Sequence, residues 1–112
     1  MSVRVRLADR RSHETIVIRH DSEMFKIGLG RNLVGAVLGP VREVFINAAR
    51  SDSMLDRLVC DGAILMSLAL QAGVTAAEIA AALKRNPDGS PASPIGAAAD
   101  LLKIESTEEE AG

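Results

Sequence analysis

The stretch that decides the fold is REVFINAARSDSMLDRLVCDGAILMSLALQAG, residues 42–73. Its first part, REVFINAA, is rich in β-branched and aromatic residues and predicts a strand. The following SDSMLD is typical of a helix start, because Ser53 can accept from early backbone N–H groups and Asp56 lies three residues on. Gly73 is the residue expected just past the helix end. The stretch therefore predicts a strand, a turn and a helix that runs to about residue 72.

This helix is apolar nearly all round between residues 62 and 70. On a helical wheel, one face groups Leu55, Leu58, Gly62, Leu65 and Ala69. A second, weakly polar stripe groups Asp56, Cys60, Ala63, Ser67 and Gln71. One sheet face cannot bury such a helix completely, so we expect a second cover. The segment TAAEIAAALKRN, residues 75–86, can supply it as a short helix with a Thr75–Glu78 capping box.

The residues before this stretch predict an antiparallel meander. SVRVRL (2–7) and ETIVIRH (14–20) alternate apolar and polar residues, and EMFKIGLG (23–30) follows a turn at Asp21–Ser22. The glycine-rich GRNLVGAVLGP (30–40) predicts a long hairpin loop before the last strand, with phosphate cradling as the alternative. The fold class is therefore α+β, an antiparallel sheet of about four strands followed by two or three helices packed on one face.

The C-terminal part predicts a turn, a helix and a tail. NPDGSPASP (86–94) is a turn-rich linker, and PIGAAADLLKIE (94–105) predicts a last short helix with Pro94 at its first position. STEEEAG (106–112) is acidic and predicts a frayed end. We expect one domain over residues 1–104 and a disordered acidic tail over residues 105–112.

Composition excludes several classes of function. A single cysteine rules out an internal disulfide and a Cys-x-x-Cys metal site, and two phenylalanines with no Trp or Tyr disfavour base stacking on aromatic platforms. The N-terminus lacks the apolar run of a signal peptide, and no window is long enough to span a bilayer. We expect a cytoplasmic protein without a membrane partner.

Few residues have the surroundings that catalysis needs. Cys60 lies about two turns into the helix with Asp56 and Asp61 nearby, and neighbouring anions oppose thiolate formation. Packing is therefore its expected role, with a nucleophile as the alternative. His13 and His20 would project to opposite faces of one strand, which disfavours a shared metal site. We expect no catalytic residue, no metal and no cofactor, and no enzyme activity from this chain alone.

The charge distribution is uneven. Residues 1–50 hold nine Arg or Lys and five acidic residues, whereas residues 51–112 hold four and ten. A basic first half can face phosphates, or it can line the solvated face of a sheet. If phosphates are bound, the expected contacts are Arg4, Arg6, Arg19, Lys26 and Arg31.

The order of these segments resembles a known family, the TSCPD domain. The resemblance covers roughly residues 14–102 and rests on REVFINAARSDSMLDRL, ILMSLALQAGV and NPDGSPASPIGAAADLL. The family occurs in the C-terminal part of adenosylcobalamin-dependent ribonucleotide reductases and as small free-standing bacterial and prophage proteins. This chain lacks the Thr-Ser-Cys-Pro-Asp motif and the paired cysteines of a reductase tail, and it is too short to hold a reductase barrel. The resemblance implies an accessory role beside a separate reductase.

Two functional hypotheses follow. The first is a non-catalytic binding or assembly module that docks onto a ribonucleotide reductase subunit or onto itself as a homodimer. Its expected contacts are Arg42, Asp56, Ser67, Gln71, Ser90, Ser93 and Gly96. For the turn that holds the last three, a surface loop tying the final helix to the core is the simpler alternative. The second hypothesis is a nucleic-acid or nucleotide binding protein that uses the basic half.

Overall fold

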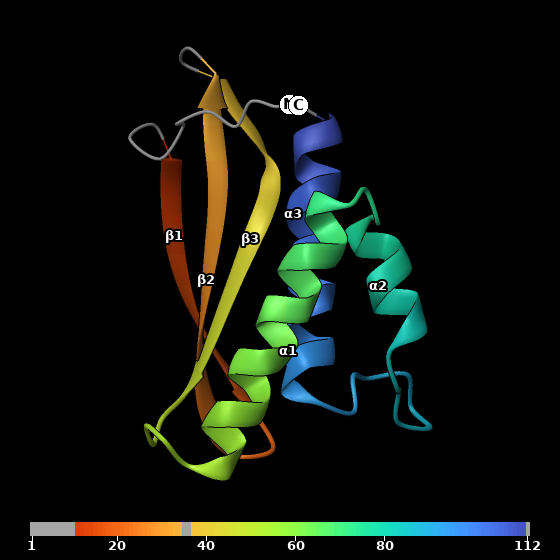
Figure 1. Ribbon diagram of the computed structural model, residues 1–112. Coiled ribbons are helices and arrows are strands. Elements are labelled where there is room, and N and C mark those ends of the chain that lie inside the picture. Colours follow the sequence, from red (N-terminus) through yellow and green to blue (C-terminus); the bar gives the residue numbers. More distant parts are fainter. Residues whose placement is uncertain (1–10, 35–36, 112) are drawn as a thin grey trace.

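The computed structural model describes residues 11–34 and 37–111. The described residues form three strands and then three helices: β1 (Arg11–His20), β2 (Glu23–Val34), β3 (Val37–Ala48), α1 (Met54–Gln71), α2 (Ala76–Ala82) and α3 (Pro94–Ala111). The strands make an antiparallel sheet in the order β1-β2-β3, and the helices lie on one side of it (Figure 1). The predicted α+β class is confirmed. The sheet has three strands over the described residues instead of four, and the strand expected at 2–7 lies outside them.

A tight turn joins β1 to β2 at the predicted place. His20 pairs with Glu23, which leaves a loop of two residues. Asp21 and Ser22 both have positive φ angles, 51° and 69°. Two successive residues in this region are typical of the type I′ turn, whose twist matches that of the two strands it joins.

The long hairpin loop predicted at residues 30–40 is wrong. β2 runs on to Val34 and β3 starts at Val37, with register shifts on either side of Arg31. Gly30 lies against Glu43 of the neighbouring strand, where a Cβ atom would come within 2.9 Å of Glu43 Oε1. Glycine in a strand often marks a bulge or a close approach of this kind. Gly30 therefore marks an irregular strand pair, and residues 31–34 and 37–40 belong to strands and not to an open loop.

The core lies between the inner face of the sheet and the helices. Alternate residues of β2 and β3 point inward and meet apolar side chains of α1 and α3. The least exposed large side chains are Phe25, Ile27, Leu29, Val44, Ile46, Val59 and Leu102.

The ends of α1 are those that the sequence predicts. Ser53 is the N-cap, and its Oγ accepts from the Asp56 N–H at 3.1 Å. Beyond the other end, Gly73 has a φ of +100°. The Val74 N–H donates to the Ala69 carbonyl at 3.0 Å, and the Gly73 N–H to the Leu70 carbonyl at 3.1 Å. This pair of bonds is the Schellman motif, so the helix is closed at both ends by local chemistry.

The two shorter helix starts also follow local signals. The capping box of α2 is present, with the Thr75 hydroxyl accepting from the Glu78 N–H and Glu78 accepting from the Thr75 N–H. Pro94 is the first residue of α3, and Ser93 Oγ accepts from the Gly96 N–H at 3.0 Å.

Helix α3 is longer than the short helix expected from the sequence. It continues to Ala111, through the segment predicted to be a disordered tail. Glu105 belongs to this helix and forms an ion pair with Arg31 at 3.0 Å. No local sequence pattern indicates a contact between an acidic residue and a buried arginine of a distant strand. The domain was therefore predicted to end at residue 104.

Helices α1 and α3 approach closely at Gly62. A Cβ atom there would lie 2.3 Å from Ile95 Cδ1 and 2.8 Å from Ile95 Cγ1. Ile95 is half-buried against the core, so moving its side chain aside disturbs that packing. We infer that glycine is needed at this crossing despite its low helix propensity.

We predict that Gly62→Ala lowers the free energy of unfolding by about 1 kcal/mol or more, because overpacking outweighs a propensity gain of about 1 kcal/mol. In an Ile95→Ala background the same change should instead raise it by about 0.5–1 kcal/mol. Urea unfolding followed by circular dichroism measures all four chains. A stabilising effect of Gly62→Ala in the wild-type background would contradict the inference.

Candidate binding site

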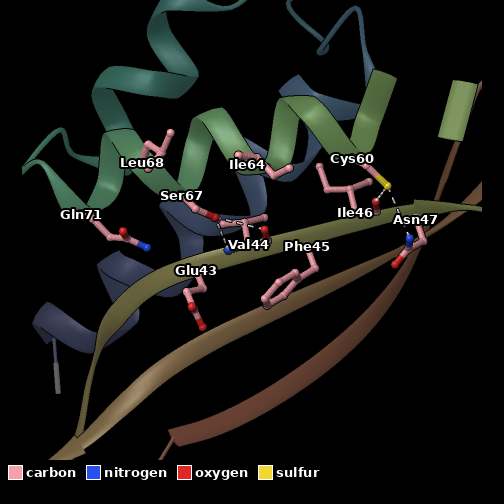
Figure 2. Close-up of a pocket in the computed structure, with 10 residues that line it drawn as sticks. All are labelled: Glu43, Val44, Phe45, Ile46, Asn47, Cys60, Ile64, Ser67, Leu68 and Gln71. Atoms are coloured by element: carbon pink, nitrogen blue, oxygen red, sulfur yellow. Dashed lines mark hydrogen bonds between the residues drawn. The ribbon is translucent and has the colours of Figure 1, made fainter. Parts of the chain in front are cut away.

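Strand β3 has a free side, because within the described sheet its one strand neighbour is β2. Backbone groups of alternate residues point to that side. Such groups are costly when buried without partners, and they invite pairing with another chain. Helix α1 runs along this side of β3 (Figures 1 and 2). It bonds to the edge through four residues of the weakly polar stripe, here called the polar stripe: Asp56, Cys60, Ser67 and Gln71.

The first half of the polar stripe covers the end of β3. Asp56 Oδ1 accepts from the Ala48 N–H at 2.9 Å, and its Oδ2 accepts from the Asp52 N–H at 3.1 Å. Cys60 Sγ donates to the Ile46 carbonyl at 3.3 Å. One carboxylate therefore ties the last residue of the strand and the turn that follows to the first turn of α1.

The second half covers the middle of β3. Ser67 Oγ accepts from the Val44 N–H at 2.9 Å and lies 3.1 Å from the Val44 carbonyl. Gln71 Nε2 donates to the Arg42 carbonyl at 3.0 Å, and Arg42 Nη1 donates to the Leu70 carbonyl at 3.0 Å. The edge of β3 is thus paired with a helix in place of a strand.

The surroundings of Cys60 disfavour a nucleophile. Burial raises the pKa of its thiol, and the nearby carboxylates of Asp56 and Asp61 raise it further. The protonated thiol is the form that donates to the Ile46 carbonyl, and Asn47 Nδ2 lies 3.6 Å from Sγ. A reactive cysteine needs the opposite setting, with a lowered pKa.

Asp56 has the opposite shift. The Ala48 and Asp52 N–H groups hold the pKa of its carboxyl below the usual value of 3.8. The ionised carboxylate is therefore the form that the folded chain favours.

A groove of about 340 Å³ opens between β3 and α1 (Figure 2). Phe45, Ile64 and Leu68 supply much of its apolar lining, and Glu43 and Asn47 lie at its strand side. Phe45 belongs to the outer face of the sheet, where its ring packs across Gly28. The groove therefore joins the outer face of the sheet to the outer face of α1.

The outer face of α1 is apolar and exposed. The helix buries a different side, and α2 packs against α3. The predicted cover of α1 by α2 is therefore wrong. The exposed fractions are 63% for Met54, 57% for Leu58, 56% for Ile64, 66% for Leu65 and 58% for Leu68. So many large apolar side chains on one helix face are typical of a protein-binding surface.

The predicted partner-binding residues fall into two separate groups. Arg42, Asp56, Ser67 and Gln71 come together at the edge of β3, where they bond within the chain. Ser90, Ser93 and Gly96 lie in or beside the turn that leads into α3. A role in binding a partner stays a prediction for both groups.

The polar groups of that turn bond mainly to one another. Ser90 donates from its N–H and its Oγ to Asp88 Oδ1, and Asn86 Nδ2 donates to Ser90 Oγ at 3.0 Å. Arg85 forms an ion pair with Asp100 of α3. These contacts favour the simpler interpretation, a loop that ties α3 to the body of the protein.

The predicted phosphate-facing residues do not form one group. Arg19 and Lys26 are exposed on the outer face of the sheet. Arg31 is buried, and it donates to the Gly39 carbonyl at 3.2 Å and to Glu105 at 3.0 Å. Arg4 and Arg6 lie outside the described residues.

Sequence reasoning missed the exposed face of α1. The wheel grouped Leu58 and Leu65 with the face that contains Leu55, but no local signal tells which face turns toward the sheet. Phe45 was detectable, because it alternates with Val44 and Ile46 and must point to the opposite side of the strand.

Neither a metal centre nor a membrane span is found in the described part of the chain. Over residues 11–34 and 37–111, no three His, Cys, Asp or Glu side chains are placed to hold a metal ion. The helices of these ranges are too short or too polar to cross a bilayer.

No family model matches the chain, and no curated protein or solved structure matches it. The resemblance to the TSCPD family stays a prediction.

We predict that Ser67→Ala lowers the free energy of unfolding by about 1–3 kcal/mol, because the Val44 N–H loses its acceptor. Ser51→Ala, at an exposed position before α1, is the control and should change it by less than about 0.5 kcal/mol. Cys60→Ala should fall between the two, since a thiol is a weak donor. Urea unfolding of the three variants measures this order, and equal effects of the two serine changes would contradict it.

We predict that the contribution of Asp56 to stability depends on pH. Because folding lowers its pKa, the ionised carboxylate stabilises the folded chain above the usual value of 3.8, and this contribution is lost as the pH falls below it through the lowered value. The deficit of Asp56→Asn relative to wild type should therefore be largest at about pH 7 and should shrink by about pH 3. Urea unfolding at both pH values measures it, with Asp61→Asn as a control on the exposed face. A deficit that stays constant with pH would contradict the prediction.

Proposed function

We propose that this chain is a non-catalytic assembly module that docks onto another protein through the exposed face of α1 and the adjoining groove. The observation that carries the proposal is the row of large apolar side chains on α1 that no other helix within residues 11–34 and 37–111 covers. Exposed apolar area on one helix is unfavourable in water, and burying it against a partner recovers that free energy.

The contacts of the polar stripe support the same surface. Because the polar stripe occupies the edge of β3 from Arg42 to Ala48, that part of the edge is not open to strand addition by a partner. A docking helix or loop meets α1 and the groove instead. The raised pKa of Cys60 weighs against an enzyme built on this thiol.

The resemblance to the TSCPD family suggests where such a module acts. We propose an accessory role in deoxyribonucleotide synthesis, in the cytoplasm, with a ribonucleotide reductase subunit or a second copy of the chain as partner. The alternative of a nucleic-acid or nucleotide binding protein has less support, because Arg31 is buried in an ion pair and only Arg19 and Lys26 of the expected contacts lie exposed among the described residues.

Size-exclusion chromatography with light scattering tests the proposal on the chain alone and mixed with a purified adenosylcobalamin-dependent ribonucleotide reductase. We expect a mass above that of the monomer in at least one of the two samples. Leu65→Asp should abolish that assembly, because it places a charge in the centre of the exposed face. Val17→Asp, on the outer face of the sheet and 55% exposed in the wild type, is the matched control and should leave it intact.

A monomer in both samples would overturn the proposal. A complex that forms equally well with Leu65→Asp would also overturn the choice of surface. Added duplex DNA that co-elutes with the chain only at low salt would move the function to the basic residues.

A further inference from the structure

The exposed residues of α1 have the spacing of a coiled-coil seam. Successive members lie alternately four and three residues apart, a line that we call the α1 seam and that ends at the C-cap residue just past the helix: Met54, Leu58, Asp61, Leu65, Leu68 and Ala72. This repeat averages 3.5 residues, the period at which side chains of one helix pack between those of another. One member, Asp61, is charged. The α1 seam therefore has the pattern of half of a helix pair.

We propose that the other half is α1 of a second copy of the chain, packed antiparallel across a two-fold axis near Ala63. This inference rests on the proposed function, since it names the partner of the same surface. A two-fold interface must be complementary to itself. About Ala63, Leu58 of one copy faces Leu68 of the other, and the large Met54 faces the small Ala72. The two ends of the α1 seam therefore complement each other in size.

Charge favours the antiparallel direction. A parallel pair would place Asp61 against Asp61 and Arg57 against Arg57 in the same layers, whereas the antiparallel pair sets the two Asp61 residues about 6 Å apart along the axis. In the antiparallel pair the two Arg57 residues lie about 18 Å apart along the axis. Each then lies at the level of Ala69 of the other α1, far from its like charge. Keeping the two Arg57 charges apart therefore favours the antiparallel direction over the parallel one.

The groove extends the same interface. Ile64 and Leu68 line the groove, and Ile64 flanks the α1 seam near the proposed axis. In the antiparallel pair Ile64 of one copy meets Ile64 of the other beside the groove and Phe45. The groove thus offers space for side chains of the second copy next to the seam.

Cross-linking tests the register directly. Leu58→Cys and Leu68→Cys are made separately in a Cys60→Ser background. The serine keeps a donor to the Ile46 carbonyl. The mass of the Cys60→Ser chain is measured first by light scattering. The two chains are mixed and treated with a short bismaleimide of about 8 Å. We expect a covalent dimer in the mixture. Leu58→Cys alone should not cross-link, because its two copies lie about 15 Å apart along the axis.

The outcomes separate this inference from the proposed function. Cross-linking of Leu58→Cys alone would show a parallel pair, and a dimer by light scattering without any cross-link would show another interface, so either overturns the inference. The chain could also be a monomer that binds the reductase, with Leu65→Asp preventing that binding. This result would overturn the inference that the partner is a second copy, but it would support the proposed function. A monomer that binds nothing would overturn both.

Dissociation constants of the dimer give a second measurement. Asp61→Leu should lower the constant, because it replaces the one charged layer of the α1 seam. Leu65→Asp should raise it by about 25-fold or more, the loss typical of a central interface residue. Val17→Asp should leave it unchanged. A dimer that Asp61→Leu weakens, or that Leu65→Asp leaves intact, would overturn the inference.

Discussion

The hydrogen bonds between the polar stripe of α1 and the backbone of β3 set the arrangement of the rest of the structure. An edge strand beside a buried face needs partners for its outward N–H and C=O groups. Here they come from carboxylate, thiol, hydroxyl and amide groups that follow one another at intervals of four, seven and four residues along a helix. Because these bonds are short and directional, they fix both the position of α1 along the edge and its rotation about its own axis.

That rotation decides which apolar residues are buried. With the polar stripe turned toward β3, Val59, Met66 and Leu70 point into the core, and Leu58 and Leu65 point to solvent. Hydrophobicity alone does not choose between these sets, because both consist of aliphatic side chains. The polar bonds choose, since either rotation buries one aliphatic set but this one also gives the edge of β3 its hydrogen-bond partners. The exposed face of α1 is therefore a consequence of how the sheet edge is covered.

This explains how much the sequence could predict. Helix ends depend on residues three or four apart, so Ser53, Gly73, Thr75 and Pro94 could be placed correctly. The polar stripe was also visible, because its spacing is local. The role of the polar stripe could not be predicted, since this role depends on which strand forms the edge of the sheet. Likewise, Glu105 was assigned to a tail because its partner, Arg31, is distant in sequence. The glycines at 30–39 suggested a loop because the close approach of Gly30 to Glu43 of the neighbouring strand appears only when the register is known.

The candidate site followed the same division between local and tertiary information. Asp56, Ser67 and Gln71 were singled out as weakly polar residues on an apolar helix, and such residues are often functional. In the structure their hydrogen bonds go to the chain's own backbone, so these residues act on stability, and the proposed association surface consists of the neighbouring leucines. The two sets lie on one helix but on different faces. Substitutions on the outward face can therefore change assembly without disturbing the edge of β3, whereas substitutions in the polar stripe act on the fold first and on any docking surface only through it. Because the polar stripe and the exposed leucines lie on different faces, the exposed face of α1 can be tested by substitutions that leave the fold intact.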